Sequence, residues 1–427
     1  MYSDVILYKG YWWIPSLPDD QVAGTLTIDS RGDMQLELYG GFCLEEKGIQ
    51  FEREEDAVIY GRCYAPNGHM KDVSLFECHS AINLNFSSNF PITRYTCYYA
   101  LIGYHTLSMN DASFFEARVE FPELAYWCPP KNITTFIKES SITIELNTSR
   151  ENCTLASIKL GNGIILNLNQ ACSYKPDYPQ VYIDQATTLE IQKEGISGFG
   201  VLSTTRSFER FLSLGMLRPI EHGRITLRAR DCYQETEKGN KYFHSIEMVT
   251  HLYIEGNKSA VKMPEMLFKH ADIEEQFESM YQKYSTEKNI AQIWSNLIDS
   301  IEKKRVFTSN DFLVVIQALD GFSKRFRKEQ DFLPQLTALR DEFKDIRRVN
   351  ITDCDLKCAI GSRDYYSHIL KVEKKKKRHA LEGEELYNLT RKLRVLLICC
   401  VLDFLGLDKN KINELLNNCN HSILRVG

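Results

Sequence analysis

The chain has 427 residues, of which 43% are hydrophobic and 26% are charged, with a formal net charge of −5. This composition excludes a disordered chain and supplies apolar side chains for more than one core, so we expect two domains. The net charge excludes a uniformly basic nucleic-acid binder, although it leaves room for a local basic groove.

The cysteines and the apolar runs bear on the location of the protein. Thirteen cysteines are an odd number without regular spacing, and residues 1–10 lack the features of a secretory signal. We therefore expect reduced thiols and a cytoplasmic location. The apolar run from Val395 to Leu402 ends at Asp403. It is much shorter than the roughly 20 residues that span a bilayer, so we expect no membrane insertion.

The first part of the chain, from Val5 to about Glu255, is rich in short β-branched and aromatic runs separated by turn residues. Several runs alternate between apolar and polar residues with period two, which is typical of half-buried strands. We therefore predict one large antiparallel sandwich or barrel-like assembly. The runs are residues 24–28, 34–38, 141–146, 181–183, 224–228 and 246–254.

The pattern changes at Met263-Pro264-Glu265, where the proline suits the start of a helix. From there on, apolar residues recur at helical spacing, which predicts an all-helical bundle. We predict an α+β multidomain protein with a strand-rich domain over 1–263 and a helical domain over 264–427, whose core is about 290–427. The apolar stripes are Ile293, Leu297 and Ile301, then Phe312, Ile316, Leu319 and Phe322, and finally Leu389, Leu393, Leu396, Leu397 and Cys400.

One segment of the helical part combines side chains that can catalyse a reaction. Arg363 precedes His368 by five positions, with Asp364 directly after the arginine. This spacing is common, and a surface arginine beside a helix-lining histidine would also explain it. Five residues of an ideal helix turn through ~500°, so the two Cβ atoms point about 140° apart. A two-fold dimer would remove this difficulty by bringing two copies of the segment together.

Two parts of the chain resemble a known family. Arg363, Asp364 and His368, followed by a final apolar helix, resemble the R-x4-6-H signature of HEPN ribonucleases. In that signature a polar residue commonly follows the arginine. The segment Gly10-Tyr11-Trp12-Trp13-Ile14-Pro15 and the glycine-containing segments 22–26 and 36–40 resemble the N-terminal domain of ApeA-type proteins. Those proteins join a strand-rich domain to an ApeA-like HEPN domain in bacterial anti-phage defence.

The resemblance implies a metal-independent endoribonuclease without a cofactor, with Arg363, Asp364 and His368 as the catalytic residues. Histidine titrates near neutrality, so His368 can take the proton from a ribose 2′-hydroxyl. Arg363 stays cationic and can hold the scissile phosphate. The expected products are a 2′,3′-cyclic phosphate and a 5′-hydroxyl, and DNA should not be cut. Asp364 either orients one of these side chains by a hydrogen bond or is a solvated first-turn acid or a helix cap.

Further residues near this segment are candidate RNA contacts. Tyr366 could stack on a base, although an aromatic residue beside a helical motif usually packs in the core. A basic run could bind phosphates without sequence preference, or could be a solvated charged segment. Asp320 lies where related bundles often carry an acid that faces the motif. The basic run consists of Lys374, Lys375, Lys376, Lys377 and Arg378.

Other catalytic classes lack their motifs. The chain contains no glycine-rich phosphate loop, no G-x-S-x-G and no H-E-x-x-H. Cys354 and Cys358 are closely spaced, but no second such pair completes a tetrahedral zinc site. We therefore expect no metal.

The resemblance also implies partners and leaves alternatives. It implies an RNA substrate, a homodimer or higher oligomer formed through the helical domain, and a phage protein as the trigger on a sensing N-terminal domain, with abortive infection as the outcome. One alternative is a non-catalytic HEPN scaffold for dimerisation. The other is a carbohydrate-binding strand domain with a helical appendage, suggested by the aromatic residues Trp12, Trp13, Tyr98, Tyr99 and Trp127.

Overall fold

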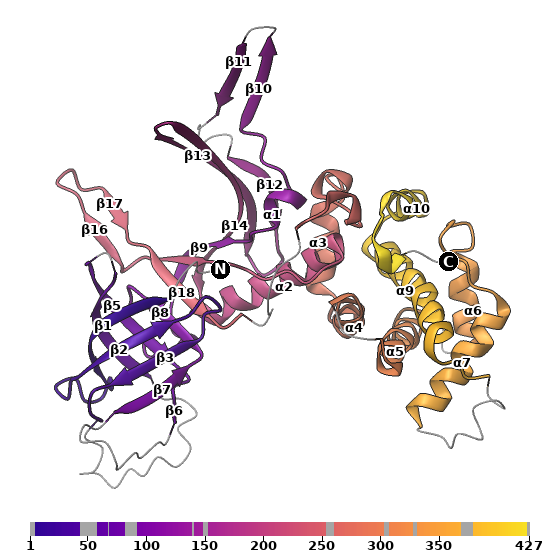
Figure 1. The fold of residues 1–427 in the computed structure, drawn as a ribbon, viewed down its shortest axis with the longest axis horizontal. Coiled ribbons are helices and arrows are strands. Elements are labelled where there is room, and N and C mark those ends of the chain that lie inside the picture. Colours follow the sequence, from indigo (N-terminus) through magenta and orange to yellow (C-terminus); the bar gives the residue numbers. More distant parts are fainter. Residues whose placement is uncertain are drawn as a thin grey trace.

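The computed structural model describes residues 5–42, 58–66, 68–81, 92–138, 141–147, 153–252, 260–302, 307–327, 331–368 and 379–424. Strands occupy the N-terminal part and helices the C-terminal part (Figure 1). The predicted fold class, an antiparallel β region followed by a helical bundle, is therefore confirmed.

One antiparallel sheet of 14 strands forms most of the N-terminal part. Its strands are β1 (Ile6–Trp13), β2 (Val22–Ile28), β3 (Met34–Leu38), β4 (Ile59–Tyr64), β5 (Met70–Phe76), β6 (His79–Ala81), β7 (Thr93–Cys97), β8 (Tyr99–Ile102), β9 (Phe114–Glu120), β12 (Thr154–Lys159), β13 (Ile165–Asp177), β14 (Gln180–Ile196), β15 (Ile225–Ala229) and β18 (Ile246–Thr250). Their order across the sheet is β12-β13-β14-β9-β15-β18-β8-β5-β4-β1-β2-β3-β7-β6. Because neighbours such as β14 and β9 are far apart in sequence, the sheet depends on long-range pairing.

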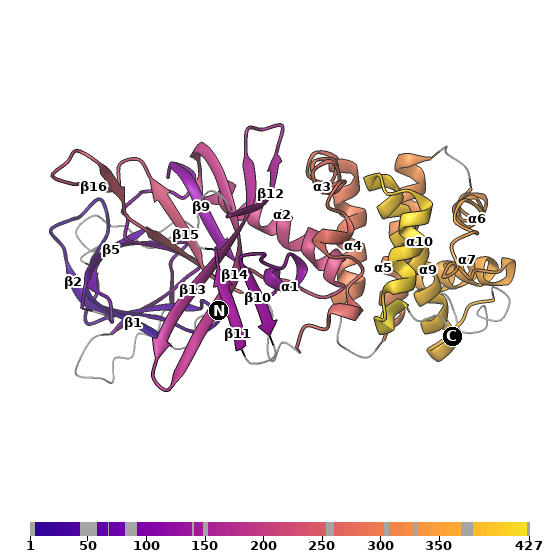
Figure 2. The same cartoon turned by 90° about the horizontal axis from the view of Figure 1, so that it is seen from above.

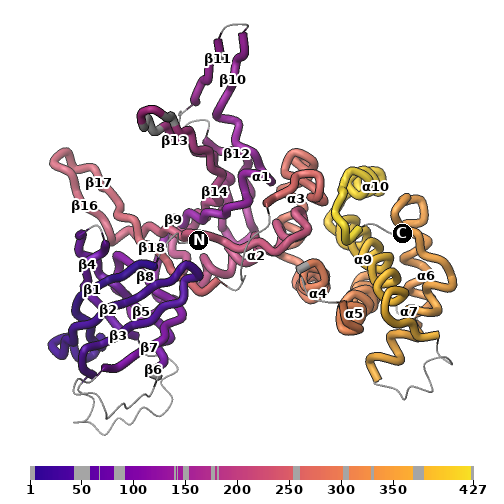
Figure 3. The backbone as a smooth tube through the Cα atoms, viewed as in Figure 1, coloured from indigo at the N-terminus to yellow at the C-terminus, as the bar shows by residue number. Residues whose placement is uncertain are grey.

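Two short ribbons accompany the sheet. They are the pairs β10 (Ile133–Lys138) with β11 (Ser141–Leu146), and β16 (Tyr233–Glu235) with β17 (Lys241–Phe243). The β10–β11 ribbon projects away from the rest of the molecule (Figure 3). Residues 141–146, expected to be a strand, form β11.

The strands from β1 to β5 curve into a barrel-like shape when seen from above (Figure 2). Its interior is a hydrophobic core rather than a channel. Alternate residues of β2 and β3, such as Leu26 and Leu36, are fully buried in it together with Trp12. Gly61 of β4 has no side chain at the point where a Cβ would overlap the ring of Trp12. A larger residue at position 61 would therefore displace the indole from the core.

The other half of the sheet packs against α2 (Gly198–Met216), and the same apolar core continues into the helices. Phe211 of α2 stacks on Trp294 of α4 (Ala291–Glu302), with ring centroids 6.2 Å apart. The Trp294 indole N–H donates a hydrogen bond to the Arg210 carbonyl at 3.1 Å. The expected domain boundary at residue 264 falls in η3 (Met263–Glu265), and the core extends across it.

Most of the remaining helices form the C-terminal bundle. They are α3 (Phe277–Thr286), α5 (Ser309–Phe326), α6 (Phe332–Glu342), α7 (Asp353–Ser367), α9 (Gly383–Leu405) and α10 (Lys409–Asn418). The shorter ones are α1 (Leu124–Trp127), η4 (His270–Asp272), η5 (Lys288–Ile290) and η6 (Ser422–Leu424).

Helix α9 lies at the centre of the bundle, and the expected apolar stripe along it is buried. The helix ends at Gly406, which adopts φ 104° in the left-handed region that favours glycine. Helices α5 and α6 pack against α9, and α7 packs against α5 and α6. This arrangement places the helix that carries Arg363 beside two others.

Candidate active site

Helix α7, which carries the candidate motif, is fixed at its first turn. The Thr352 hydroxyl accepts the Asp355 N–H at 3.2 Å, and the Asp355 carboxylate accepts the Thr352 N–H at 2.8 Å, which forms a capping box. The Lys392 ammonium of α9 donates to the same carboxylate at 2.9 Å. Burial acts to raise the pKa of Asp355, but these hydrogen bonds outweigh it and hold the pKa below its usual range.

The last turns of α7 are fixed by the residues that lead into α9. The buried Ser362 hydroxyl accepts the Leu381 N–H at 2.9 Å, and the Tyr366 hydroxyl donates to the Leu381 carbonyl at 2.8 Å. Burial raises the pKa of the Tyr366 phenol, so it remains a neutral donor. The hydroxyl of Tyr366 therefore has a structural partner, and its contact with RNA stays a prediction about its ring.

Three helices meet at Arg363. Its Nη2 atom donates to Asp320 Oδ2 of α5 at 3.2 Å, and the guanidinium carbon lies 4.9 Å from the centroid of the Phe332 ring of α6. The Arg363 side chain is 32% exposed, whereas that of Asp320 is 13% exposed. A guanidinium has five N–H donors, and the bond to Asp320 uses one of them among the described residues. The arrangement therefore holds the charge in place while leaving one side open to an anion.

Asp320 accepts hydrogen bonds from two cations at once. The Lys324 ammonium, one helical turn further along α5, lies 2.9 Å from the same Oδ2 atom that accepts from Arg363. The other carboxylate oxygen, Oδ1, is buried without a hydrogen-bond partner among the described residues. Two positive charges on one carboxylate leave the cluster with a net positive charge, which favours phosphate.

His368 ends α7 as its C-terminal capping residue, with φ −101° and ψ 3°, and its side chain is exposed. Within the part of the chain that the structure describes, it makes no hydrogen bond or ion pair with Arg363. This separation agrees with the angle of about 140° expected for residues five apart on a helix. Asp364 is half-buried on α7 directly after Arg363. Among the described residues, no hydrogen bond or ion pair therefore joins the two principal residues.

The remaining candidate RNA contacts cannot be placed. The basic run from Lys374 to Arg378 lies outside the described residues, which end at His368 and resume at His379. Its role stays a prediction from the sequence.

The aromatic residues that suggested carbohydrate binding do not form an exposed row. Trp12 and Trp127 are fully buried, and Trp13 is 9% exposed. Tyr99 packs edge-on against Phe199 of α2. A sugar needs accessible ring faces to stack on, so the three buried tryptophans do not support this alternative, and of the five residues Tyr98 is the most accessible at 46%.

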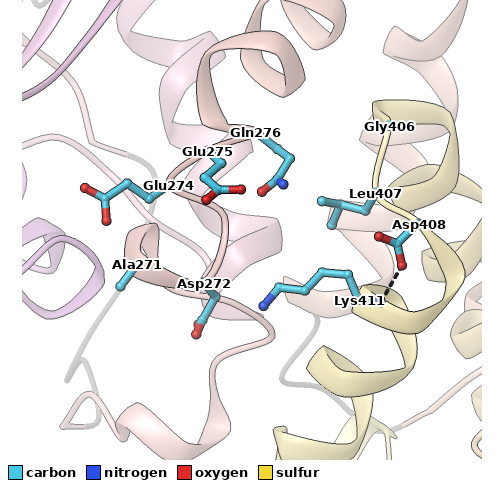
Figure 4. Close-up of a pocket in the computed structure, with 9 residues that line it drawn as sticks. All are labelled: Ala271, Asp272, Glu274, Glu275, Gln276, Gly406, Leu407, Asp408 and Lys411. Carbon is cyan, nitrogen blue, oxygen red and sulfur yellow. Dashed lines mark hydrogen bonds between the residues drawn. The ribbon is translucent and has the colours of Figure 1, made fainter.

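A cavity of about 540 Å³ lies elsewhere, between the segment before α3 and the turn from α9 to α10 (Figure 4). Its lining is largely polar, and Lys411 of α10 points into it opposite Asp272. The lining residues are Ala271, Asp272, Glu274, Glu275, Gln276, Gly406, Leu407, Asp408 and Lys411. None of them belongs to the motif, so the cavity is separate from the candidate active site.

Among the described residues, no group of three or more histidine, cysteine, aspartate or glutamate side chains could hold a metal ion. No helix in the described ranges is both long and apolar enough to span a bilayer.

Lys324 and Phe332 were not predicted from the sequence. Lys324 follows Asp320 by four residues, so helical spacing could have placed it on the same face. Phe332 carries no such signal, because it reaches Arg363 only through the packing of α6 beside α7.

Two family models match the chain, and the first extends past the expected boundary at residue 264. The family model of the ApeA N-terminal domain 1 matches residues 7–284, and that of the Apea-like HEPN domain matches residues 336–411. The second range contains Arg363 and His368. No curated protein and no solved structure matches the chain. The domain combination supports a role in antiviral defence and a HEPN nuclease assignment. The chain belongs to the ApeA-type proteins, which carry this N-terminal domain ahead of an ApeA-like HEPN domain.

Proposed function

We propose that this protein is a metal-independent endoribonuclease of bacterial anti-phage defence, active in the cytoplasm, with Arg363 and His368 as its catalytic pair. The main support is the environment of Arg363, which Asp320 and Phe332 hold in place while its side chain stays 32% exposed. A guanidinium fixed in this way is suited to bind a phosphate and to stabilise the charge that develops on it. Its place in an Apea-like HEPN domain adds to this support.

The proposed reaction uses the 2′-hydroxyl of the RNA as the nucleophile. His368 removes the proton from this hydroxyl, and the 2′-oxygen then forms a bond to the adjacent phosphorus while the bond to the 5′-oxygen breaks. Arg363 donates hydrogen bonds to the non-bridging oxygens of the phosphate. The departing 5′-oxygen takes up a proton, which leaves a 2′,3′-cyclic phosphate and a 5′-hydroxyl. Asp364 would orient one of the two catalytic side chains.

A homodimer through the HEPN domain would complete the site. Arg363 and His368 lie five residues apart on α7 and make no contact with each other among the described residues. A two-fold axis beside α7 could place Arg363 near His368 of the partner subunit. The Tyr366 ring and the basic run from Lys374 to Arg378 would then contact the RNA on either side of the cut.

The N-terminal domain would act as the sensor of a phage protein. Helices α2 and α4 share one apolar core, so a structural change in the N-terminal domain could reach the bundle through their contact. Deleting the domain would expose that core, so a change in activity could come from misfolding and not from the loss of regulation. A sharper test selects phages that escape the defence and co-expresses the affected gene without infection. The sensor proposal requires that its product switches on RNA cleavage.

The nuclease proposal is tested by comparing wild type with Arg363→Ala and His368→Ala, during overexpression and during phage challenge. Lys357→Ala, an exposed residue on the same helix, is the matched control. Both catalytic variants should lose protection and the cyclic-phosphate RNA ends, while the control keeps them and all variants remain folded. Full protection with either catalytic variant would contradict the proposal and leave the HEPN bundle as a dimerisation scaffold.

A further inference from the structure

Lys324 brings a second positive charge next to Arg363. Its ammonium lies 2.9 Å from Asp320 Oδ2, and Arg363 Nη2 lies 3.2 Å from the same atom. The two nitrogen atoms are therefore at most 6.1 Å apart, the sum of these two distances. Anything that binds Arg363 from the solvent side comes within reach of the flexible lysine side chain.

The ion pair with Asp320 does not account for Lys324. The carboxylate is already paired with Arg363, and the Lys324 side chain is 59% exposed, so solvent screens its attraction to Asp320. Two nearby arginines differ from Lys324, because each has a hydrogen-bond or ion-pair partner that it does not share with Arg363. Arg325 donates to the Asn289 carbonyl at 3.2 Å, and Arg327 pairs with Glu342 at 3.0 Å. Lys324 can therefore leave Asp320 and bind another anion at little cost in free energy.

We propose that Lys324 binds the RNA phosphate next to the one that Arg363 holds, an inference that depends on the proposed ribonuclease function. A compact ammonium on a long flexible chain suits a backbone phosphate, whose contact requires no particular base. The planar guanidinium suits the scissile phosphate, where direction matters. The substrate is then an RNA strand with at least two consecutive phosphates rather than a single phosphodiester.

Substrate length separates this role from a structural one. The full-length protein would be assayed as wild type, Lys324→Ala, Lys324→Arg and Arg325→Ala, on a single-stranded RNA of about ten nucleotides and on a dinucleoside monophosphate. The dinucleoside has one phosphate, so it lacks the group that Lys324 binds. Arg325→Ala is the control for loss of a neighbouring positive charge on α5.

We expect Lys324→Ala to raise the KM for the longer RNA on the order of 10-fold with kcat nearly unchanged. The salt dependence of RNA binding should fall by roughly 0.7 in the log–log slope, the contribution of one phosphate on a single strand. Cleavage of the dinucleoside should not change, Lys324→Arg should restore the KM, and Arg325→Ala should behave as wild type.

Two results would overturn the proposal. They are an unchanged KM for the longer RNA, and an equal loss on both substrates, which would indicate a structural role. Binding of the intact RNA, measured by fluorescence anisotropy in the His368→Ala background, keeps this test separate from catalysis. If wild type binds the RNA but does not cut it even with the trigger present, the nuclease proposal fails while the salt slopes still decide the role of Lys324. If wild type does not bind the RNA even with the trigger present, both proposals fail.

Discussion

Replacing Asp320 with asparagine removes the negative charge that faces Arg363 and keeps the shape of the side chain. The amide oxygen can still accept from Arg363 Nη2 and Lys324 Nζ, which lie 3.2 Å and 2.9 Å from Oδ2. The amide nitrogen would take the place of Oδ1, which is buried without a partner among the described residues. The substitution therefore changes the electrostatics of the site with little change in packing.

The two effects on stability nearly cancel. Both bonds keep a cationic donor, so each stays within the range of about 1.5–3 kcal/mol for hydrogen bonds to charged groups, and loss of the carboxylate charge costs at most about 1.5 kcal/mol per bond, or about 3 kcal/mol for the two. Solvent reduces this figure, because Lys324 is 59% and Arg363 32% exposed. Removing a mostly buried charge returns a similar amount in desolvation. We expect the free energy of unfolding to change by no more than about 1 kcal/mol.

The effect on catalysis should be larger. Without the charge of Asp320, the Arg363 side chain is held less firmly, and misplacement of a phosphate-binding group slows the chemical step. We expect the cleavage rate to fall about 10-fold, which corresponds to about 1.4 kcal/mol in the activation free energy. Urea unfolding and single-turnover cleavage of the same preparations measure the two quantities.

Asp341→Asn, at an exposed carboxylate of α6 that pairs with Arg340 at 2.7 Å, controls for the loss of a surface ion pair. It should leave cleavage unchanged. A wild-type rate for Asp320→Asn would refute the argument that Asp320 holds Arg363 for catalysis. A loss of stability above about 3 kcal/mol with an unchanged rate would show that Asp320 matters only for folding.

Three further predictions concern the supports of α7 and α9. Asp355→Asn should lower the free energy of unfolding by about 2 kcal/mol in urea, because it weakens the cap and the pair with Lys392. The folded-state pKa of Asp355 lies below its ordinary value of 3.8, so the ionised carboxylate stabilises the fold above pH 3.8 and this stabilisation disappears as the pH falls through the folded-state pKa. The variant should therefore lose less stability on acidification than wild type. An equal loss of stability in the two proteins at low pH would contradict this. Gly406→Ala should lower the free energy of unfolding by about 1 kcal/mol in the same urea measurement, because alanine is strained at a φ of 104°. No neighbour lies near the added methyl group, so backbone strain is the only expected cause and an unchanged stability would rule it out. Tyr366→Phe should lower the free energy of unfolding by about 1 kcal/mol, because the Leu381 carbonyl loses its hydrogen-bond donor, and it should leave the cleavage rate nearly unchanged. A drop of about 10-fold in the cleavage rate would instead assign the hydroxyl a part in the reaction.

The local pattern of the sequence predicted the type of several elements, but it missed α2, a helix of 19 residues within the strand-rich part. Residues 34–38 form β3 because their alternate side chains are buried, and the stripe Leu389, Leu393 and Leu396 is buried along α9. The order of strands across the sheet was not predictable. The pairing of β14 with β9 joins residues far apart in the chain, and no local period encodes it.

The candidate site was predictable where a motif exists and not where tertiary packing decides. The spacing of Arg363 and His368 could be read directly, and the acid expected to face the motif, Asp320, does contact Arg363. Phe332 was missed because only the packing of α6 brings it to the arginine. The tryptophans that suggested a carbohydrate-binding domain are buried, because composition does not distinguish a buried indole such as Trp12 from an exposed one.

The central claim is that this protein cuts RNA by attack of the 2′-hydroxyl and without a metal. The most direct measurement incubates the purified full-length protein, together with its trigger once that is identified, with end-labelled RNA in the presence of EDTA. A second RNA carries a single 2′-deoxy nucleotide at the cleaved position. We predict cleavage of the first RNA to a 2′,3′-cyclic phosphate, no cleavage of the second at that position, and loss of the reaction in Arg363→Ala and His368→Ala. Cleavage of the deoxy-substituted position, a dependence on divalent metal, or wild-type activity in either variant would contradict the claim.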